Sequence, residues 1–289
     1  TFELKYGDKT ETFSFWDDLI AYINANPYKA GSHIITVLKD ADIGSFTMPQ
    51  NGKYNELLLQ VEDQFSPKQL TFSGDIELTG DLQLRHGIRF ASKNDNGYRI
   101  KLNGRTLTLF EDETLSDAIT EVYDDNKGAA SSILTLEQSE ITSIDYAVNN
   151  IGILTIKGNT ELNNTVNVRE LDAGTPVYIG NKAVTVQDIS FRGTDDKVIA
   201  YTTNDFVPIT ITGTTSSDIK FALVDSSDHS VYKKFENGKT LLILSTVALT
   251  KLKLADNSKP TEDVAFVRDG SEVKLSKAKY RVSRNGSSV

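Results

Sequence analysis

The sequence predicts an all-β protein whose strands wind as a β-solenoid, with short amphipathic helices that cap it. Three observations lead to this fold class. Short alternating apolar runs occur along most of the 289 residues, a six-residue repeat occupies residues 69–91, and two helix-like segments stand about 100 residues apart. We therefore expect a fold built by repetition along the chain.

The alternating runs are rich in Thr, Val, Ile, Leu, Phe and Tyr and are bounded by Gly, Asn and Asp, which is typical of β-strands. Threonine alone contributes 29 residues. Most runs are four to seven residues long, so we expect many short strands. The clearest runs are 33–39, 57–61, 100–103, 106–109, 133–136, 151–157, 184–186, 209–212 and 241–244.

Between residues 69 and 91 the chain repeats itself in steps of six, reading QLTFSG, DIELTG, DLQLRH and GIRFAS. Each step carries two apolar residues that alternation places on one face of a strand, and Gly74, Gly80 and Gly87 supply bends. A hairpin meander would favour Asn-Gly or Asp-Gly at these bends. We therefore prefer a chain that keeps turning in one sense and stacks its coils roughly 4.8 Å apart. The apolar pairs are Leu70 and Phe72, Ile76 and Leu78, Leu82 and Leu84, and Ile88 and Phe90.

Two segments, 12–26 and 112–126, predict short amphipathic helices. Ser14 and Thr114 each stand three residues before an aspartate, which is the pattern of an N-cap with an acid in the first helical turn. A helix laid across the open end of a solenoid covers unpaired strand edges and the apolar core. We therefore expect the first helix to be a cap. The two apolar stripes are Trp16, Leu19, Ile20 and Ile23, and Leu115, Ala118, Ile119 and Val122.

The strands that follow these helices also resemble each other, since IITVLKDADIGSF from Ile34 is similar to ILTLEQSEITSI from Ile133. This echo predicts two related modules, and the alternative is that the second helix crosses between coils of one continuous stack. We expect a first module at 1–112 that includes the N-terminal capping helix, a second at 113–200 that begins with the second helix, and final coils or a small terminal β domain at 201–289.

The last segment carries two hairpin-like turns, at Asn237-Gly238 and at Asp269-Gly270. Such pairs favour tight two-residue connections between antiparallel strands. We therefore expect at least part of residues 201–289 to depart from the winding of the preceding coils.

The charge balance and the rare residues exclude several functions. Lys and Arg number 31 against 40 Asp and Glu, which gives a net charge of −9 and argues against nucleic acid as a partner. No run approaches the roughly 18 apolar residues that a membrane span needs. The absence of Cys removes thiol chemistry, and neither a nucleotide-binding glycine loop nor G-x-S-x-G occurs.

The order of a helix, a strand ITVLKD, the tetrapeptide IGSF and then LLLQ, LTFSGDIELTGDLQL and IKLNGRTLTL carries a resemblance. These segments resemble the right-handed parallel β-helix, pectate-lyase-like, regions of secreted or cell-wall-attached surface proteins of gut bacteria. The resemblance covers about residues 12–200. It implies a right-handed parallel β-helix and an extracellular or wall-attached location, and it implies little about a ligand.

Polygalacturonase-like enzymes share this fold and use aspartates, a His-Gly element and an Arg-Ile-Lys element on one glycosidic bond. Fragments resembling these occur here at Asp195 and Asp196, at His86-Gly87, and at Arg99 and Lys101. Their order differs from that of the family, in which the aspartates come first. Here the basic elements precede the aspartates by roughly 95 residues or more. We therefore interpret the aspartates as a solvated turn and the two cations as an exposed strand edge.

A pectate-lyase reaction would instead need Ca²⁺ held by several carboxylates beside a basic residue. Acidic groupings occur at Asp40 with Asp42, at 111–113 and at Asp124 with Asp125, but none has EF-hand spacing. The sequence therefore predicts no cofactor and no metal site, while an incidental calcium ion stays open. The three histidines are scattered, so we expect surface or turn positions for His33, His86 and His229.

Exposed aromatic rings are a further candidate, because sugars bind on flat rings. Most Phe residues and Trp16 fall at core-type positions, whereas five Tyr residues are candidates for a shared outer face that binds a glycan or a protein. They are Tyr54, Tyr98, Tyr146, Tyr178 and Tyr201.

Taken together, these features favour a non-enzymatic bacterial surface or secreted β-solenoid for adhesion, ligand display or spacing, with a glycan or a host or cell-surface protein as partner. A stack of coils is stiff and presents ladders of side chains without disulfides. The alternative is a carbohydrate-active β-helix enzyme, a lyase or glycoside hydrolase, with a site that the sequence does not reveal.

Overall fold

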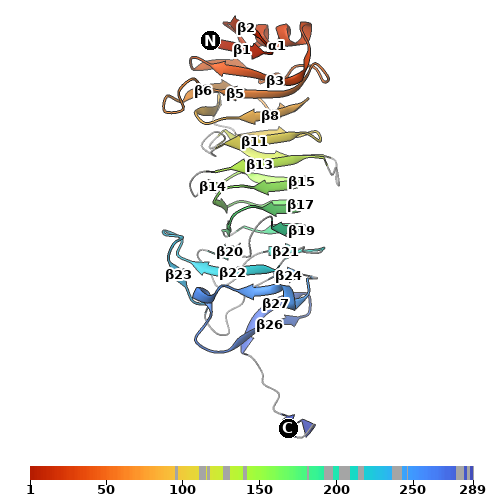
Figure 1. The fold of residues 1–289 in the computed structure, drawn as a ribbon, viewed down its shortest axis with the longest axis vertical. Coiled ribbons are helices and arrows are strands. Elements are labelled where there is room, and N and C mark those ends of the chain that lie inside the picture. The colour runs from red at the N-terminus through yellow and green to blue at the C-terminus, as the bar shows by residue number, and fades with distance from the viewer. Residues whose placement is uncertain are drawn as a thin grey trace.

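The chain is mostly β, as predicted. The computed structural model describes all residues except 95–96, 111–114, 116–117, 126–130, 139–141, 181, 192–197, 202–208, 214–217, 236–242, 246, 278–282, 285–286 and 289. Its strands are stacked along one long axis, with the N-terminal strands at one end and the last long strands at the other (Figure 1). No helix within the described ranges is long and apolar enough to cross a membrane.

The described strands form one long sheet and three smaller ones. The long sheet contains β1 (Phe2–Tyr6), β2 (Lys9–Phe13), β3 (Tyr28–Val37), β5 (Tyr54–Gln60), β7 (Ile76–Glu77), β8 (Asp81–Leu84), β10 (Tyr98–Lys101), β11 (Thr106–Phe110), β12 (Ile119–Tyr123), β13 (Ile133–Glu137), β15 (Ala147–Ile156), β17 (Val166–Ala173), β19 (Val184–Phe191), β21 (Ile209–Ile211), β24 (Ile243–Ser245), β26 (Val264–Asp269) and β27 (Glu272–Lys277).

The second sheet contains β14 (Thr142–Ile144), β16 (Thr160–Leu162), β18 (Val177–Ile179), β20 (Val198–Tyr201), β22 (Ile219–Val224), β23 (Tyr232–Lys233) and β25 (Leu252–Leu254). The third contains β4 (Ala41–Gly44), β6 (Lys68–Phe72) and β9 (Ile88–Ser92), and the last pairs β28 (Ser283–Arg284) with β29 (Ser287–Ser288). Every run predicted from alternation overlaps one of these strands, although residues 241–242 lie outside the described ranges.

Parallel pairing places like residues above one another in columns. Leu57, Leu82, Leu107, Leu134 and Leu154 follow in register on β5, β8, β11, β13 and β15, and all five are fully buried. A second column crosses β7, β10, β12, β15, β17 and β19. It consists of Ile76, Ile100, Val122, Val148, Val166 and Val184.

The six-residue repeat forms strands, but its successive strands do not pair with each other. β6 pairs in parallel with β9, β7 pairs with β10, and β8 pairs with β5 and β11. The hairpin-meander alternative is therefore wrong, and all eight predicted apolar residues are buried. At Gly87, where φ is +82°, an added Cβ would lie 2.5 Å from Val61 Cγ2, so both the turn and the close approach require glycine.

Helix α1 (Trp16–Ala25) lies at the N-terminal end of the stack, as predicted (Figure 1). Trp16 anchors it, since its ring packs on Phe2 and Phe46 and its Nε1 donates to the Thr47 carbonyl at 2.8 Å. The predicted N-cap at Ser14 is wrong. The cap residue is Phe15, because the helix begins at the buried Trp16. Phe15 makes no side-chain capping bond.

The second predicted helix is wrong where the structure describes it, because Ile119–Tyr123 forms strand β12. The register between β10 and β12 shifts between Tyr98 and Arg99, which leaves Thr120 as an extra, bulged residue. The bulge brings Ile119 and Val122 to the buried side although they are three residues apart, and this spacing mimics a helical stripe. Thr114 and Asp117, the proposed cap and its acid, lie outside the described ranges.

The predicted first and second modules share the long sheet, since β10 and β11 pair directly with β12 and β13. Their division at 112/113 stays a prediction. At the far end, β26 and β27 form an antiparallel hairpin in which Asp269 pairs with Glu272, so the predicted hairpin is present, but its two-residue turn is Gly270-Ser271, one residue beyond the predicted Asp269-Gly270. The turn predicted at Asn237-Gly238 lies outside the described ranges.

Candidate functional site

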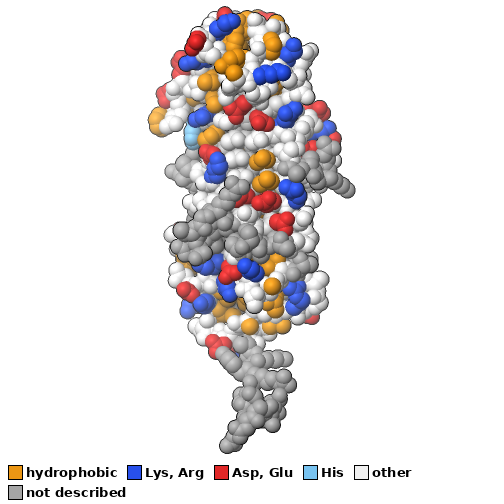
Figure 2. All heavy atoms as spheres, turned by 45° about the vertical axis from the view of Figure 1, so that its right-hand side comes forward, with side chains coloured by type: hydrophobic (Ala, Val, Ile, Leu, Met, Phe, Trp, Pro, Cys, Tyr) orange, Lys and Arg blue, Asp and Glu red, His pale blue; other side chains and the backbone are white. Residues whose placement is uncertain are grey.

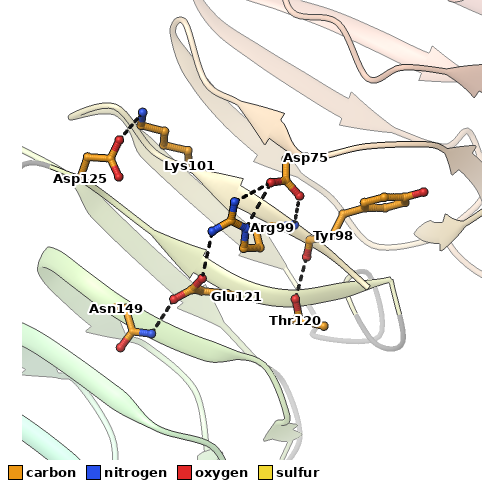
Figure 3. Close-up of polar contacts among 8 residues, drawn as sticks. All are labelled: Asp75, Tyr98, Arg99, Lys101, Thr120, Glu121, Asp125 and Asn149. Atoms are coloured by element: carbon orange, nitrogen blue, oxygen red, sulfur yellow. Dashed lines mark hydrogen bonds and ion pairs between the residues drawn. The ribbon is translucent and has the colours of Figure 1, made fainter. Parts of the chain in front are cut away.

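Arg99 lies on β10 in a chain of polar contacts that crosses successive strands (Figure 3). Its Nε and Nη2 donate to Asp75 Oδ2 at 3.1 and 3.0 Å, and its backbone N–H donates to Asp75 Oδ1 at 2.9 Å. Nη1 is 3.9 Å from Glu121 Oε2 on β12, and Glu121 accepts a hydrogen bond from Asn149 Nδ2 at 2.6 Å on β15. The hydrogen bond to Asp75 raises the pKa of Arg99.

Lys101, the second basic residue of the Arg-Ile-Lys element, is also paired. Its ammonium contacts Asp125 Oδ2, and this contact raises the pKa of Lys101 (Figure 3). A general base must release its proton near neutral pH, whereas this pairing favours the protonated form. The surroundings of Arg99 and Lys101 therefore suit a structural ladder across the strands better than proton transfer.

The structure does not place the other elements of the polygalacturonase-like pattern beside Arg99 and Lys101. Asp195 and Asp196 lie outside the described ranges. His86 is at the predicted turn position before β9, where its ring lies 6.1 Å from that of Phe110. The His-Gly element lies in the turn between β8 and β9, beside Phe110 of β11, whereas the Arg-Ile-Lys element lies within β10.

The described members of the acidic groupings contact lysine or backbone N–H groups of the chain itself. Asp42 contacts Lys93 Nζ at 2.6 Å and the Gly44 N–H at 3.1 Å, and the Lys93 contact lowers its pKa. Asp40 accepts from the Gln69 N–H at 2.8 Å, and Asp124 accepts from the Gly104 N–H at 2.7 Å. Residues 111–113 are not described, and in the remainder no three His, Cys, Asp or Glu side chains are grouped to hold a metal ion.

The predicted outer face of five Tyr residues is wrong for two of them. Tyr54 and Tyr146 are 3% and 2% exposed, because both point into the core, and burial raises the pKa of Tyr54 to about 12. Tyr98 is half-buried against Phe72 at 5.6 Å. Tyr178 is half-buried on the second sheet, where it stacks on His229 at 4.4 Å. Tyr201 ends β20, and its side chain lies outside what the structure describes.

The predicted surface or turn position of His33 is also wrong, since this side chain is fully buried. It stacks on Tyr6 at 5.6 Å and meets the edges of Tyr28 and Tyr54. Neither ring nitrogen has a hydrogen-bond partner among the described residues, and burial lowers its pKa. His229 occupies a turn, as expected, with Nε2 3.9 Å from Glu161 Oε2.

Sequence reasoning missed a cleft of about 250 Å³ that lies over β15, β17, β19 and β21. It forms where β15 turns a corner at Asn150, whose φ of +56° accompanies a register shift against β17. Its side chains include Asn167, Arg169 and Gln187. The Asn149-Asn150 pair was the one available signal, because asparagine tolerates the left-handed conformation that such a corner requires.

Elsewhere on the surface, acidic and basic side chains alternate over the face drawn in Figure 2 and form no large field of one sign. Comparisons of the chain with models of protein families, with curated proteins and with solved structures gave no match.

Proposed function

We propose that this chain is a right-handed parallel β-helix that serves as a non-enzymatic bacterial surface or secreted module for adhesion, ligand display or spacing. We further propose an extracellular or wall-attached location and a glycan or a host or cell-surface protein as partner. The β-helix is supported by parallel strand pairs that recur in register along the chain and by short bends in place of hairpins.

One observation carries the functional proposal: outward side chains also stack in columns. Lys101, Tyr123, Asn149, Asn167 and Thr185 follow one another in register on successive strands. Such a stack holds each outward group at a fixed spacing of roughly 4.8 Å from the next. A rigid ladder of this kind suits the presentation of a binding face, since little ordering remains to be done on association.

The test combines a glycan array and a panel of surface proteins with an assay for cleavage of the bound saccharides. We expect saturable binding without release of reducing or unsaturated sugar ends. Cleavage that scales with protein concentration and is lost in R99Q or K101Q would overturn the proposal in favour of the carbohydrate-active enzyme. A crystal structure with left-handed winding would overturn the fold assignment.

A further inference from the structure

We propose that the cleft over β15, β17, β19 and β21 binds a saccharide that carries a single carboxylate, and that Arg169 holds this carboxylate. The inference deepens the proposed display function and rests on it in one respect, namely that the ligand is bound and not cleaved. It is carried by the placement of the cleft side chains, by the unpaired cation among them, and by the charges around it.

The cleft side chains form two short columns on either side of a strand corner. Asn167 and Thr185 are paired in register on β17 and β19. Arg169 and Gln187 occupy the next equivalent positions, because each lies between the register pairs Val168 with Val186 and Glu170 with Asp188. The cleft is therefore lined by residues of β15, β17 and β19 and by Thr212, and its polar side chains are amides, two hydroxyls and one guanidinium.

The Arg169 side chain has no ion pair and no hydrogen bond among the described residues, although it is only partly exposed. The contrast with β10 is direct, since Arg99 and Lys101 are both paired with carboxylates. The side chains of Asn167 and Gln187 likewise make no hydrogen bond in the described part of the chain. A half-buried guanidinium without a partner gains by binding an external one, and it fits a carboxylate through two parallel hydrogen bonds, whereas Asn167 and Gln187 stand exposed beside it.

The surroundings limit the ligand to one negative charge. The positions that flank Arg169 on the two neighbouring strands are the neutral Gly152 and Gln187, and Thr212 follows beyond Gln187. Glu170 and Asp188 follow directly on the same two strands, and the chain has a net charge of −9. A polyanion would meet repulsion there, whereas one carboxylate meets one cation.

The neutral groups point to a saccharide as the carrier of that charge. Amide and hydroxyl side chains donate and accept hydrogen bonds, as sugar hydroxyl groups do. They recur on neighbouring strands at roughly 4.8 Å, which is about the length of one pyranose unit, whereas an extended peptide advances roughly 3.3 Å per residue. The cleft thus offers one ring a charged contact and gives the adjacent rings neutral contacts.

The test is calorimetric titration at low salt with a synthetic glucose–glucuronate–glucose trisaccharide. Four comparison ligands are the all-glucose trisaccharide, the glucuronate methyl ester, the analogue with glucose 6-sulfate at the centre, and trigalacturonate. R169Q is the test variant, and R89Q is the matched control because Arg89 is an exposed arginine on β9 in another sheet. We expect weak binding of the acidic trisaccharide, in the order of 1 mM.

R169Q is expected to weaken that binding about tenfold or more, while R89Q leaves it unchanged. The methyl ester and the all-glucose ligand should bind as weakly to the parent protein as the acidic one binds to R169Q.

Stronger binding of the sulfate ligand than of the acidic trisaccharide would contradict a preference for a carboxylate. Stronger binding of trigalacturonate would contradict the limit of one negative charge. Equal losses in R169Q and R89Q, or no binding of the acidic trisaccharide, would overturn the site. Binding to the glycan array that survives R169Q would leave the display function standing without this cleft.

Discussion

At the scale of single residues, His33 occupies a leucine position. It pairs in register with Leu57, which stands first in the column that continues through Leu82 and Leu107. Neutral histidine fills the space under the rings of Tyr6 and Tyr54, but its two nitrogens are buried without partners among the described residues. Burial of an unsatisfied polar group destabilises the fold, and burial of its charged form destabilises it further.

The protein is therefore expected to lose stability as the pH falls from 7 to 5. Burial lowers the pKa of His33 in the folded chain below its unfolded value of about 6.5. The unfolded state then takes up more protons, so this contribution is complete above the unfolded pKa and is lost as the pH falls toward the folded one. Thermal unfolding followed by circular dichroism at pH 5, 6, 7 and 8 measures the slope.

H33L should raise the free energy of unfolding by about 1–2 kcal/mol at pH 7 and flatten the slope between pH 7 and 5. H86Q serves as the control, because His86 lies at a turn, and it should keep the parent slope. A parent slope that persists unchanged in H33L would show that other groups produce the acid sensitivity.

A second prediction concerns Phe15, the cap of α1, which is 70% exposed and makes no side-chain capping bond. F15S places a hydroxyl oxygen where the first N–H groups of the helix lack an acceptor. We expect stabilisation by about 1 kcal/mol in urea unfolding. F65S, which removes an 85% exposed phenylalanine away from any helix terminus, is the control and should change little. Equal effects of the two variants would point to lost exposed apolar surface instead of capping.

At the scale of elements, the bulge of β12 explains where sequence reasoning failed. Alternation predicted the strands because each buries every second residue on one face. Alternation does not reveal an extra, bulged residue within a strand. The bulge at Thr120 therefore made the apolar spacing of this strand look like that of a helix. The sequence also did not reveal which strands pair, since β6 pairs with β9 and not with β7 or β8, which are nearer in sequence.

The candidate site was predictable only in part for the same reason. Arg99 and Lys101 were identified from a short motif, but their partners Asp75 and Asp125 are 24 residues away in sequence and meet them only through the stacking of strands. The cleft at Arg169 depends on the corner at Asn150 and on the register of the next strands, which no local pattern specifies.

The bulge itself can be tested through Gly97, which precedes β10. A Cβ added there would lie 2.2 Å from Thr120 Cγ2. We expect G97A to destabilise the protein by about 1–3 kcal/mol through this overlap. T120S removes the colliding methyl group, so G97A should be far less harmful in the T120S background, and a double-mutant cycle by urea unfolding measures the difference. Additive effects would mean that the bulged Thr120 does not contact residue 97.

At the scale of the whole molecule, neighbouring levels of the long sheet are held by parallel strand pairs in register. The absence of cysteine allows these levels to be probed with introduced pairs. Thr135 pairs in register with Thr155 on the next strand and with Thr108 on the preceding one. Neighbouring strands lie roughly 4.8 Å apart, within the Cα range that a disulfide spans.

Mild oxidation of T135C/T155C should therefore give a disulfide within one chain and raise the midpoint of thermal unfolding. T108C/T155C, whose members are two levels apart, should stay reduced. Non-reducing electrophoresis and mass spectrometry distinguish the two outcomes. Efficient bridging in the T108C/T155C variant would contradict the register of β11, β13 and β15.

The even spacing of the valine column also bears on how such a chain changes over evolution. Val148, Val166 and Val184 stand 18 residues apart and are stacked in register. A duplicated copy of residues 148–165 would meet the same apolar neighbours above and below as the original does. The rod would then lengthen by one strand spacing, roughly 4.8 Å, while both ends keep their structures. One inserted level would therefore move the cleft relative to the N-terminal helix without rebuilding either.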